Sequence, residues 1–170
     1  NYQDITLEAS LMQTKIDGYL ISKDPAVPLD IIFRADSLQG DYVATVNGRV
    51  ERADLLALNF MQEPFVVGTD IDINATLGKE ETYILRAHLD SLWIMDAVRS
   101  YELGDLILNL DSDNSRTTVD FSSGDLVLGF RADTSLMSLA GQFGAAANVI
   151  SKQIEERNID MEQIQDTLPA

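Results

Sequence analysis

The sequence of 170 residues predicts an α+β fold, mostly β, in which an antiparallel-rich sheet is followed by helices. Apolar and polar residues alternate through most of the chain, which is typical of strands with one apolar face. Such a run ends in Asp-Ser-Leu at residues 29–38 and again at 83–92, with degenerate copies at 106–112 and 126–134. After Thr134 the apolar period changes to 3.6, which indicates a helix. Strands grouped before helices favour the α+β class.

The expected strands follow one another with turn-forming residues between them. Gly18 is expected to mark a bulge or a twist, and Pro25 and Pro28 mark a loop. The alternation is cleanest between Thr69 and Leu77, where Asp70 begins the polar set. We expect strands at residues 5–9, 15–22, 29–36, 42–50, 69–77, 82–89, 103–110, 117–121 and 125–131.

Two segments break the alternation. Residues 53–58 carry Leu55, Leu56 and Leu58 at a spacing that fits a single helical turn better than a strand. Residues 93–101 place apolar side chains at helical spacing, so we expect a short helix or a loop there.

The C-terminal part is expected to be helical. Its apolar stripe consists of Leu136, Leu139, Phe143, Ala147, Ile150 and Ile154. A capping box at residues 160–163 predicts a final short helix. We therefore expect one domain, with the sheet at 1–132 and helices at 133–170 that pack on it. Because the chain begins with Asn1 rather than Met, we expect it to be a segment of a longer protein.

The composition narrows the classes of function. Twelve basic and 28 acidic residues give a net charge of −16, which disfavours binding to nucleic acid or to anionic headgroups. The chain has no cysteine, which excludes disulfides, thiolate metal sites and cysteine nucleophiles. The absence of cysteine fits a cytosolic protein and equally a periplasmic protein.

We find no catalytic or metal-binding constellation and expect a protein that is not an enzyme and uses no cofactor. The single histidine, His88, lies within a strand whose neighbouring side chains point to opposite faces. No nucleophile elbow, phosphate-binding loop or dinucleotide fingerprint is present. Asp70, Asp72, Asn74 and Glu81 have the spacing of a calcium loop, but Ala75 stands where that loop needs glycine.

The chain resembles the TamB-type family, the inner-membrane component of the translocation and assembly module, which belongs with the AsmA-like proteins. The likeness lies in Arg34-Ala35-Asp36-Ser37-Leu38, in the run from Gly48 to Leu58, and in residues 124–130 with the C-terminal helices. It covers most of the chain, although no single motif is diagnostic. The resemblance implies a sheet curled into an open trough, a β-taco, with an apolar concave face.

The resemblance also implies a setting and a function. Members are anchored in the inner membrane, span the periplasm, take part in outer-membrane biogenesis by phospholipid transport, and assist protein secretion and outer-membrane protein assembly with a β-barrel partner. Acyl chains need a continuous apolar strip, which stacked alternating strands supply. The candidate groove-lining residues are Ile31, Phe33, Ile71, Ile73, Leu85, Leu106, Leu108, Leu126, Leu128 and Phe130.

Two alternatives remain open at this stage. The same residues could form a sealed core between sheet and helix, and the protein would then bind a partner by adding a strand at a sheet edge. Apolar residues at Ile32, Ile84, Ile107 and Val127 lie on the nominally polar face, which would suit strands covered on both sides. A hydrolase or metal enzyme is the third and weakest alternative.

Overall fold

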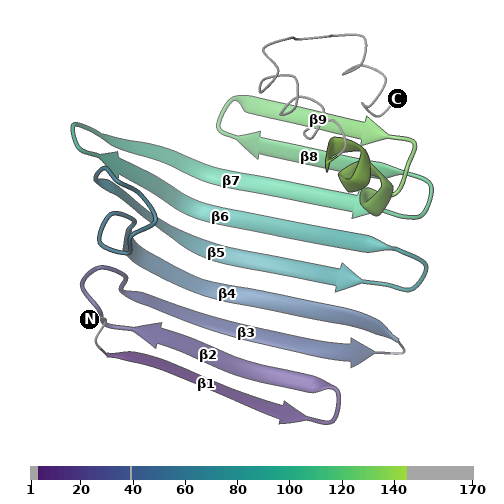
Figure 1. Cartoon of the computed structure of the whole chain (residues 1–170), viewed down its shortest axis with the longest axis horizontal. Coiled ribbons are helices and arrows are strands. Elements are labelled where there is room, and N and C mark those ends of the chain that lie inside the picture. The colour runs from purple at the N-terminus through teal and green to yellow at the C-terminus, as the bar shows by residue number, and fades with distance from the viewer. Residues whose placement is uncertain (1–3, 39, 145–170) are drawn as a thin grey trace, which may run out of the picture.

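The computed structural model describes residues 4–38 and 40–144, which form one open sheet of nine strands followed by a helical segment (Figure 1). Every strand pairs in antiparallel fashion with its neighbour in sequence, in the order β1 to β9. The strands are β1 (Ile5–Met12), β2 (Lys15–Ser22), β3 (Leu29–Leu38), β4 (Asp41–Asp54), β5 (Phe65–Leu77), β6 (Tyr83–Asp96), β7 (Ser100–Ser112), β8 (Thr117–Ser123) and β9 (Leu126–Ala132). The α+β, mostly β fold with a curled antiparallel sheet is confirmed.

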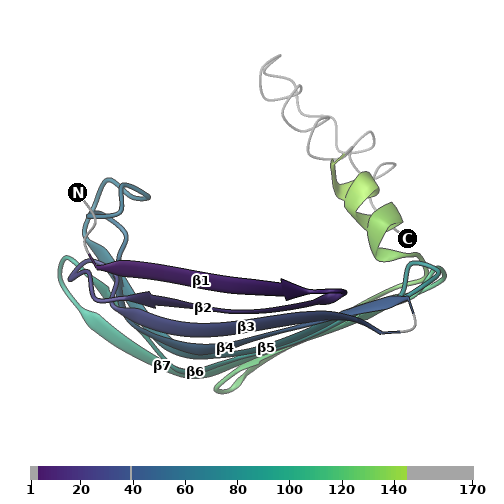
Figure 2. The same ribbon diagram turned by 90° about the horizontal axis from the view of Figure 1, so that it is seen from below.

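The sheet is curved rather than flat. Figure 2 views it edge-on and shows strands that are bowed along their length, so that their ends rise on one side. The helical segment at residues 136–144 and the connection between β4 and β5 both lie on that side. The molecule therefore has a concave and a convex face, and the axis of the hollow runs across the strands.

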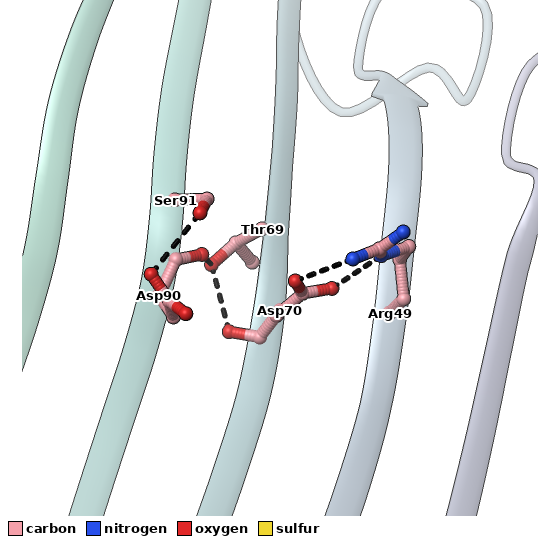
Figure 3. Close-up of polar contacts among 5 residues, drawn as sticks. All are labelled: Arg49, Thr69, Asp70, Asp90 and Ser91. Atoms are coloured by element: carbon pink, nitrogen blue, oxygen red, sulfur yellow. Dashed lines mark hydrogen bonds and ion pairs between the residues drawn. The ribbon is translucent and has the colours of Figure 1, made fainter.

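Bulges accompany the curvature in the longest strands. The pairing of β4 with β5 shifts between Val50 and Ala53, and that of β5 with β6 shifts between Gly68 and Asp70. Ser91 lies at this second shift with a φ of 53°. The Thr69 hydroxyl donates to the Asp90 carbonyl oxygen at 3.0 Å, which ties β5 to β6 there, and Figure 3 shows these two residues side by side. An extra residue on one strand locally increases bending and twist.

The structure corrects two expectations about individual segments. Residues 93–96 continue β6 and residues 100–101 begin β7, whereas the sequence predicted a short helix or loop. The bulge beside Ser91 changes which side chains of β6 point to each face of the sheet. The spacing of apolar residues after the bulge therefore resembles that of a helix. Gly18 marks no bulge, since the pairing of β2 with both neighbours is unbroken.

Glycines instead make room for aromatic rings on neighbouring strands. Gly18 lies directly opposite Phe33, and a Cβ atom added to Gly18 would stand 2.3 Å from the Phe33 ring. Gly68 lies opposite Trp93 in the same way, with the indole nitrogen 2.3 Å from an added Cβ. These close approaches need the absence of a side chain.

In the connection between β4 and β5, the Leu58 N–H donates to the Asp54 carbonyl oxygen and forms the single helical turn predicted for residues 53–58.

The segment after the sheet begins as the expected helix, and only part of it is described. The helix occupies residues 136–144, and Leu139 is buried. The expected positions Ala147, Ile150 and Ile154 and the final helix at residues 160–163 lie outside the described residues.

Polar side chains fasten this helix to the end of the sheet. The Thr117 hydroxyl donates to the Thr134 carbonyl oxygen at 2.8 Å, and the Leu136 N–H donates to Ser112 Oγ at 2.9 Å. Thr117 uses its single proton on Thr134, so Ser112, at 2.8 Å, donates to Thr117. Thr117 is fully buried, so losing one of its hydrogen bonds would leave a buried polar group unsatisfied. These bonds therefore help to fix the position of the helix.

Candidate functional site

The two faces of the sheet differ sharply in chemistry. Residues paired across neighbouring antiparallel strands point to the same face, so the register assigns every strand position to one face. One face carries Leu7, Leu20 and Ile31 in line, and the other carries Asp30, Arg49 and Asp70 in line. We call these the apolar face and the polar face.

Three adjacent rows of the apolar face cross all nine strands without a charged side chain. The middle row is Ala9, Gly18, Phe33, Val46, Ile73, Ala87, Leu108, Phe121 and Leu128. The row on one side is Leu7, Leu20, Ile31, Gly48, Ile71, Leu89, Leu106, Ser123 and Leu126. The row on the other side is Leu11, Ile16, Ala35, Ala44, Ala75, Leu85, Leu110, Val119 and Phe130. We refer to these as the apolar rows.

The register places every candidate lining residue in these rows. Phe33, Ile73, Leu108 and Leu128 lie in the middle row. Ile31, Ile71, Leu106 and Leu126 lie in the second row, and Leu85 and Phe130 in the third. The sequence analysis omitted members such as Leu7, Leu11, Leu20, Leu89, Leu110 and Phe121. The alternation of apolar and polar residues in their strands places them on the same face as the candidates.

The apolar face is the concave one. Ser112 and Thr117 point to the apolar face, since they pair with Tyr83 and Ala132 in the row beside Leu110 and Phe130. Their hydroxyls bond to the start of the helix at residues 136–144, so the helix lies on the apolar side. Figure 2 shows this helix on the concave side of the sheet.

Little of the apolar face is covered by the described part of the chain. Among residues 4–38 and 40–144, the buried apolar side chains are Ala53, Val66, Leu92, Ala132 and Leu139. All five lie outside the apolar rows: four are in β4, β5, β6 and β9, and Leu139 is in the helix at residues 136–144. Within the rows, Leu7 is 64% exposed and Leu128 is 55% exposed. The described residues therefore form a single layer with an open apolar surface, without a sealed core over the rows.

The apolar rows have the dimensions of a lipid-sized strip. Nine strands spaced about 4.8 Å apart give rows about 38 Å long. The three rows are two residues apart along each strand, so they span about 14 Å. One leaflet's hydrocarbon is about 15 Å deep, so the strip exceeds one extended acyl chain in length.

The polar face is held by charge pairs between strands. Arg49 on β4 donates to both carboxylate oxygens of Asp70 on β5, with Nη2 to Oδ2 at 2.7 Å (Figure 3). The guanidinium holds the pKa of the Asp70 carboxyl below its ordinary range. Arg86 on β6 reaches Asp111 on β7 at 2.7 Å, and Arg34 reaches Asp17 at 3.3 Å. These exposed pairs link three pairs of neighbouring strands only weakly, and a further pair between Lys15 and Asp17 lies within β2.

Four apolar residues of the polar face are exposed rather than covered by a second layer. Ile32 is 49% exposed, and Ile84, Ile107 and Val127 are also exposed. The expectation that such strands are covered on both sides is therefore wrong for the described residues. A shallow hollow of about 560 Å³ surrounds Ile32 over β1 to β3, and it is bordered by Glu8, Tyr19 and Arg34.

No catalytic grouping forms around the histidine in the described residues. His88 Nε2 lies 3.7 Å from Asp105 Oδ2 and has no hydrogen-bond partner among them. The Ser91 hydroxyl donates to Asp90 Oδ1 at 3.0 Å instead of to the imidazole.

The residues with calcium-loop spacing do not surround a cation site. Asp70 and Asp72 lie in β5, where Asp70 pairs with Arg49 and Asp72 accepts a hydrogen bond from Asn74. The described residues contain no group of three or more metal-ligating side chains placed to hold an ion.

Comparison with family models, curated proteins and solved structures gave no match to this chain. No helix within residues 4–38 and 40–144 has the length and hydropathy needed to cross a bilayer.

Proposed function

We propose that this chain is a non-enzymatic, periplasmic segment of an outer-membrane biogenesis protein, and that its concave apolar face conducts phospholipid. The observation that carries the proposal is the set of three apolar rows, which cross nine strands without a charge. Its resemblance to TamB-type proteins supplies the setting, with the parent chain anchored in the inner membrane and a β-barrel partner in the outer membrane. Assistance to outer-membrane protein assembly belongs to the same proposal.

The physical driving force is the removal of acyl chains from water. Each methylene that leaves water contributes about 0.8 kcal/mol, and a strip of leucine, isoleucine and phenylalanine offers no polar competitor. An acyl chain that lies along the apolar rows meets a similar apolar surface at each strand, so moving by one strand changes its contacts little. This equivalence suits transport, because no single site holds the lipid strongly.

The open side of the sheet accommodates the headgroup. The described residues leave the rows exposed along β1 and β9, so a headgroup can remain in water above the strip. No cluster of basic side chains is needed, which agrees with a chain of net charge −16. The arrangement predicts selectivity for chain length and apolarity over headgroup chemistry.

Native mass spectrometry of the purified protein with phospholipid vesicles tests the proposal. We expect bound phospholipid on the native protein and at least a tenfold loss in the double variant Ile73→Arg/Leu108→Arg, which places two charges in the middle row. The matched control is Ile84→Arg/Ile107→Arg, which makes the same kind of change on the polar face of β6 and β7.

The control should retain lipid at the level of the native protein. Circular dichroism would establish that both variants remain folded. Equal lipid on all three proteins, or none on the native protein, would contradict transport along the concave face.

A second candidate function is binding of another polypeptide at a sheet edge. The observation that favours it is β1, an outermost strand in which all eight residues from Ile5 to Met12 are exposed. Edge strands present unpaired backbone donors and acceptors. This candidate is compatible with an open apolar face, and it does not require the sealed core expected at first.

A further inference from the structure

The connection between β4 and β5 presents large apolar side chains to solvent. Residues 55–62 include no charged side chain, although 24% of the residues of the chain are charged. Within this run Phe60 is 78% exposed, and Leu56 and Met61 are exposed as well. We call residues 55–62 the apolar tip. Exposed groups of large apolar side chains mark surfaces that meet a partner or a membrane.

Backbone hydrogen bonds hold the apolar tip in one conformation. The Leu55 N–H donates to the Phe65 carbonyl oxygen at 2.8 Å, which closes the base of the connection. The Leu55 carbonyl oxygen accepts from the N–H of Phe60 at 2.9 Å and from that of Met61 at 3.1 Å. Asn59 has a φ of 61°, a left-handed conformation that asparagine tolerates, and it turns the chain back toward its base. Because the loop is already ordered, its binding to a partner loses little conformational entropy.

A second exposed apolar residue lies in the neighbouring connection. Phe65 pairs with Asp96, so the bases of the β4–β5 and β6–β7 connections are adjacent. Val98, in the turn between β6 and β7, is 83% exposed. The Asp96 carboxylate accepts from the N–H groups of Val98 and Arg99, both at 2.7 Å, which fixes this turn. Figure 1 shows the two connections at the same end of the sheet.

The turns at the opposite end of the sheet have different chemistry. The connection between β5 and β6, residues 78–82, is Gly-Lys-Glu-Glu-Thr, and the one between β7 and β8, residues 113–116, is Asp-Asn-Ser-Arg. Neither contains a large apolar side chain. The connections at one end therefore suit water, whereas the apolar tip and Val98 at the other end suit an apolar environment.

We propose that the apolar tip, together with Val98, inserts into the surface of a lipid bilayer. Figure 2 shows the β4–β5 connection protruding on the concave side of the sheet, and a protrusion without charge can enter the boundary between headgroups and acyl chains. The charged residues Asp54 and Glu63 flank the tip in sequence and would remain at the headgroup level.

The charge of the chain indicates which bilayer the tip meets. A net charge of −16 repels anionic headgroups, so we expect insertion into bilayers of zwitterionic phospholipid. This inference goes beyond conduction of phospholipid along the apolar rows and does not depend on it. It assigns to one end of the sheet the place where the protein contacts a membrane.

A fluorescent label at the tip tests insertion directly, because the chain contains no cysteine. The Phe60→Cys variant, labelled with the environment-sensitive fluorophore NBD, should emit at shorter wavelength when phosphatidylcholine vesicles are added. Nitroxide groups on the acyl chains of the vesicles should quench this emission. The matched control is Asn47→Cys, an exposed position on the polar face, where the same label should show neither effect. An unchanged spectrum for the label at position 60 would overturn the proposal.

Vesicle flotation provides a measurement without a label. The Phe60→Ser/Met61→Ser variant should lower the affinity for phosphatidylcholine vesicles about tenfold or more, because two apolar side chains no longer leave water. The control Ile32→Ser/Val127→Ser removes two exposed apolar side chains from the polar face and should float as the native protein does. Equal flotation of the tip variant and the native protein would contradict insertion of the tip.

The variant with charges in the middle apolar row separates this result from the lipid experiment. Ile73→Arg/Leu108→Arg should lose bound phospholipid and still float with vesicles, since its apolar tip is unchanged. If this variant lost flotation while Phe60→Ser/Met61→Ser retained it, the apolar rows rather than the tip would be the surface that binds vesicles.

Discussion

At the scale of single residues, glycine and an aromatic ring on the next strand form a recurring pair. Gly18 accepts the Phe33 ring on the apolar face, and Gly68 accepts the Trp93 indole on the polar face. The ring covers backbone that a glycine would otherwise leave bare, as in aromatic rescue of strand glycines. The sequence contains both members of each pair, but only the register reveals that they meet.

The Gly68→Ala variant should lose about 1–3 kcal/mol of unfolding free energy, because the new Cβ would overlap the indole and lie 2.7 Å from the Glu51 carbonyl oxygen. Trp93 is the single tryptophan, so its fluorescence emission should shift as well. Gly129→Ala is the control, since its Cβ would meet nothing closer than Asp120 Oδ1 at 3.4 Å. Equal urea midpoints for the two variants would contradict this packing.

Asp113 should make the turn between β7 and β8 sensitive to acid. The Ser115 hydroxyl and the N–H groups of Ser115 and Arg116 donate to its carboxylate, which lowers the pKa of Asp113 from its ordinary value of 3.8. A lowered pKa contributes stability above pH 3.8, and this contribution disappears as the pH falls through the folded-state value.

Thermal unfolding of the native protein and the Asp113→Asn variant checks the sign. The native protein should have the higher Tm at about pH 7, and the difference should shrink as the pH falls below 3.8 and through the lowered folded-state pKa of Asp113. A difference that stays constant over this range would show that the charge of Asp113 does not stabilise the turn.

At the scale of elements, alternation predicted the strands well because each has one apolar face. The bounds expected for β2 agree with the structure, and those of most other strands were too short by a few residues. The failure at residues 93–101 has a tertiary cause. The bulge at Ser91 changes the phase of β6, and the Gly68–Trp93 contact that fixes the new phase joins residues far apart in sequence.

The helix at residues 136–144 is attached at its start, so it should separate from the sheet before the sheet unfolds. The Thr117→Val variant removes the hydroxyl shared by Ser112 and Thr134, leaving the Thr134 carbonyl oxygen without this donor, at a cost of about 1–3 kcal/mol. Hydrogen exchange should rise at residues 136–144 and remain unchanged in β4 to β6. Uniform acceleration over all strands would contradict a local attachment.

At the scale of the whole molecule, the sequence could not distinguish an open groove from a sealed core. Both arrangements require the same alternation, and Ile73 or Leu108 would look identical in either. The sequence did predict that the ten candidate residues share a face, because strand pairing with matched apolar sides leaves little choice. Which side is concave depends on bulges and on the helix attachment at Ser112 and Thr117, which carry no sequence signal of comparable strength.

The most direct test of transport along the concave face is photocrosslinking with a phospholipid that carries a diazirine within one acyl chain, followed by peptide mapping. We expect labels on residues of the apolar rows, spread from β1 to β9, with few on the polar face. Labels concentrated in the hollow around Ile32, or divided equally between the two faces, would contradict the account.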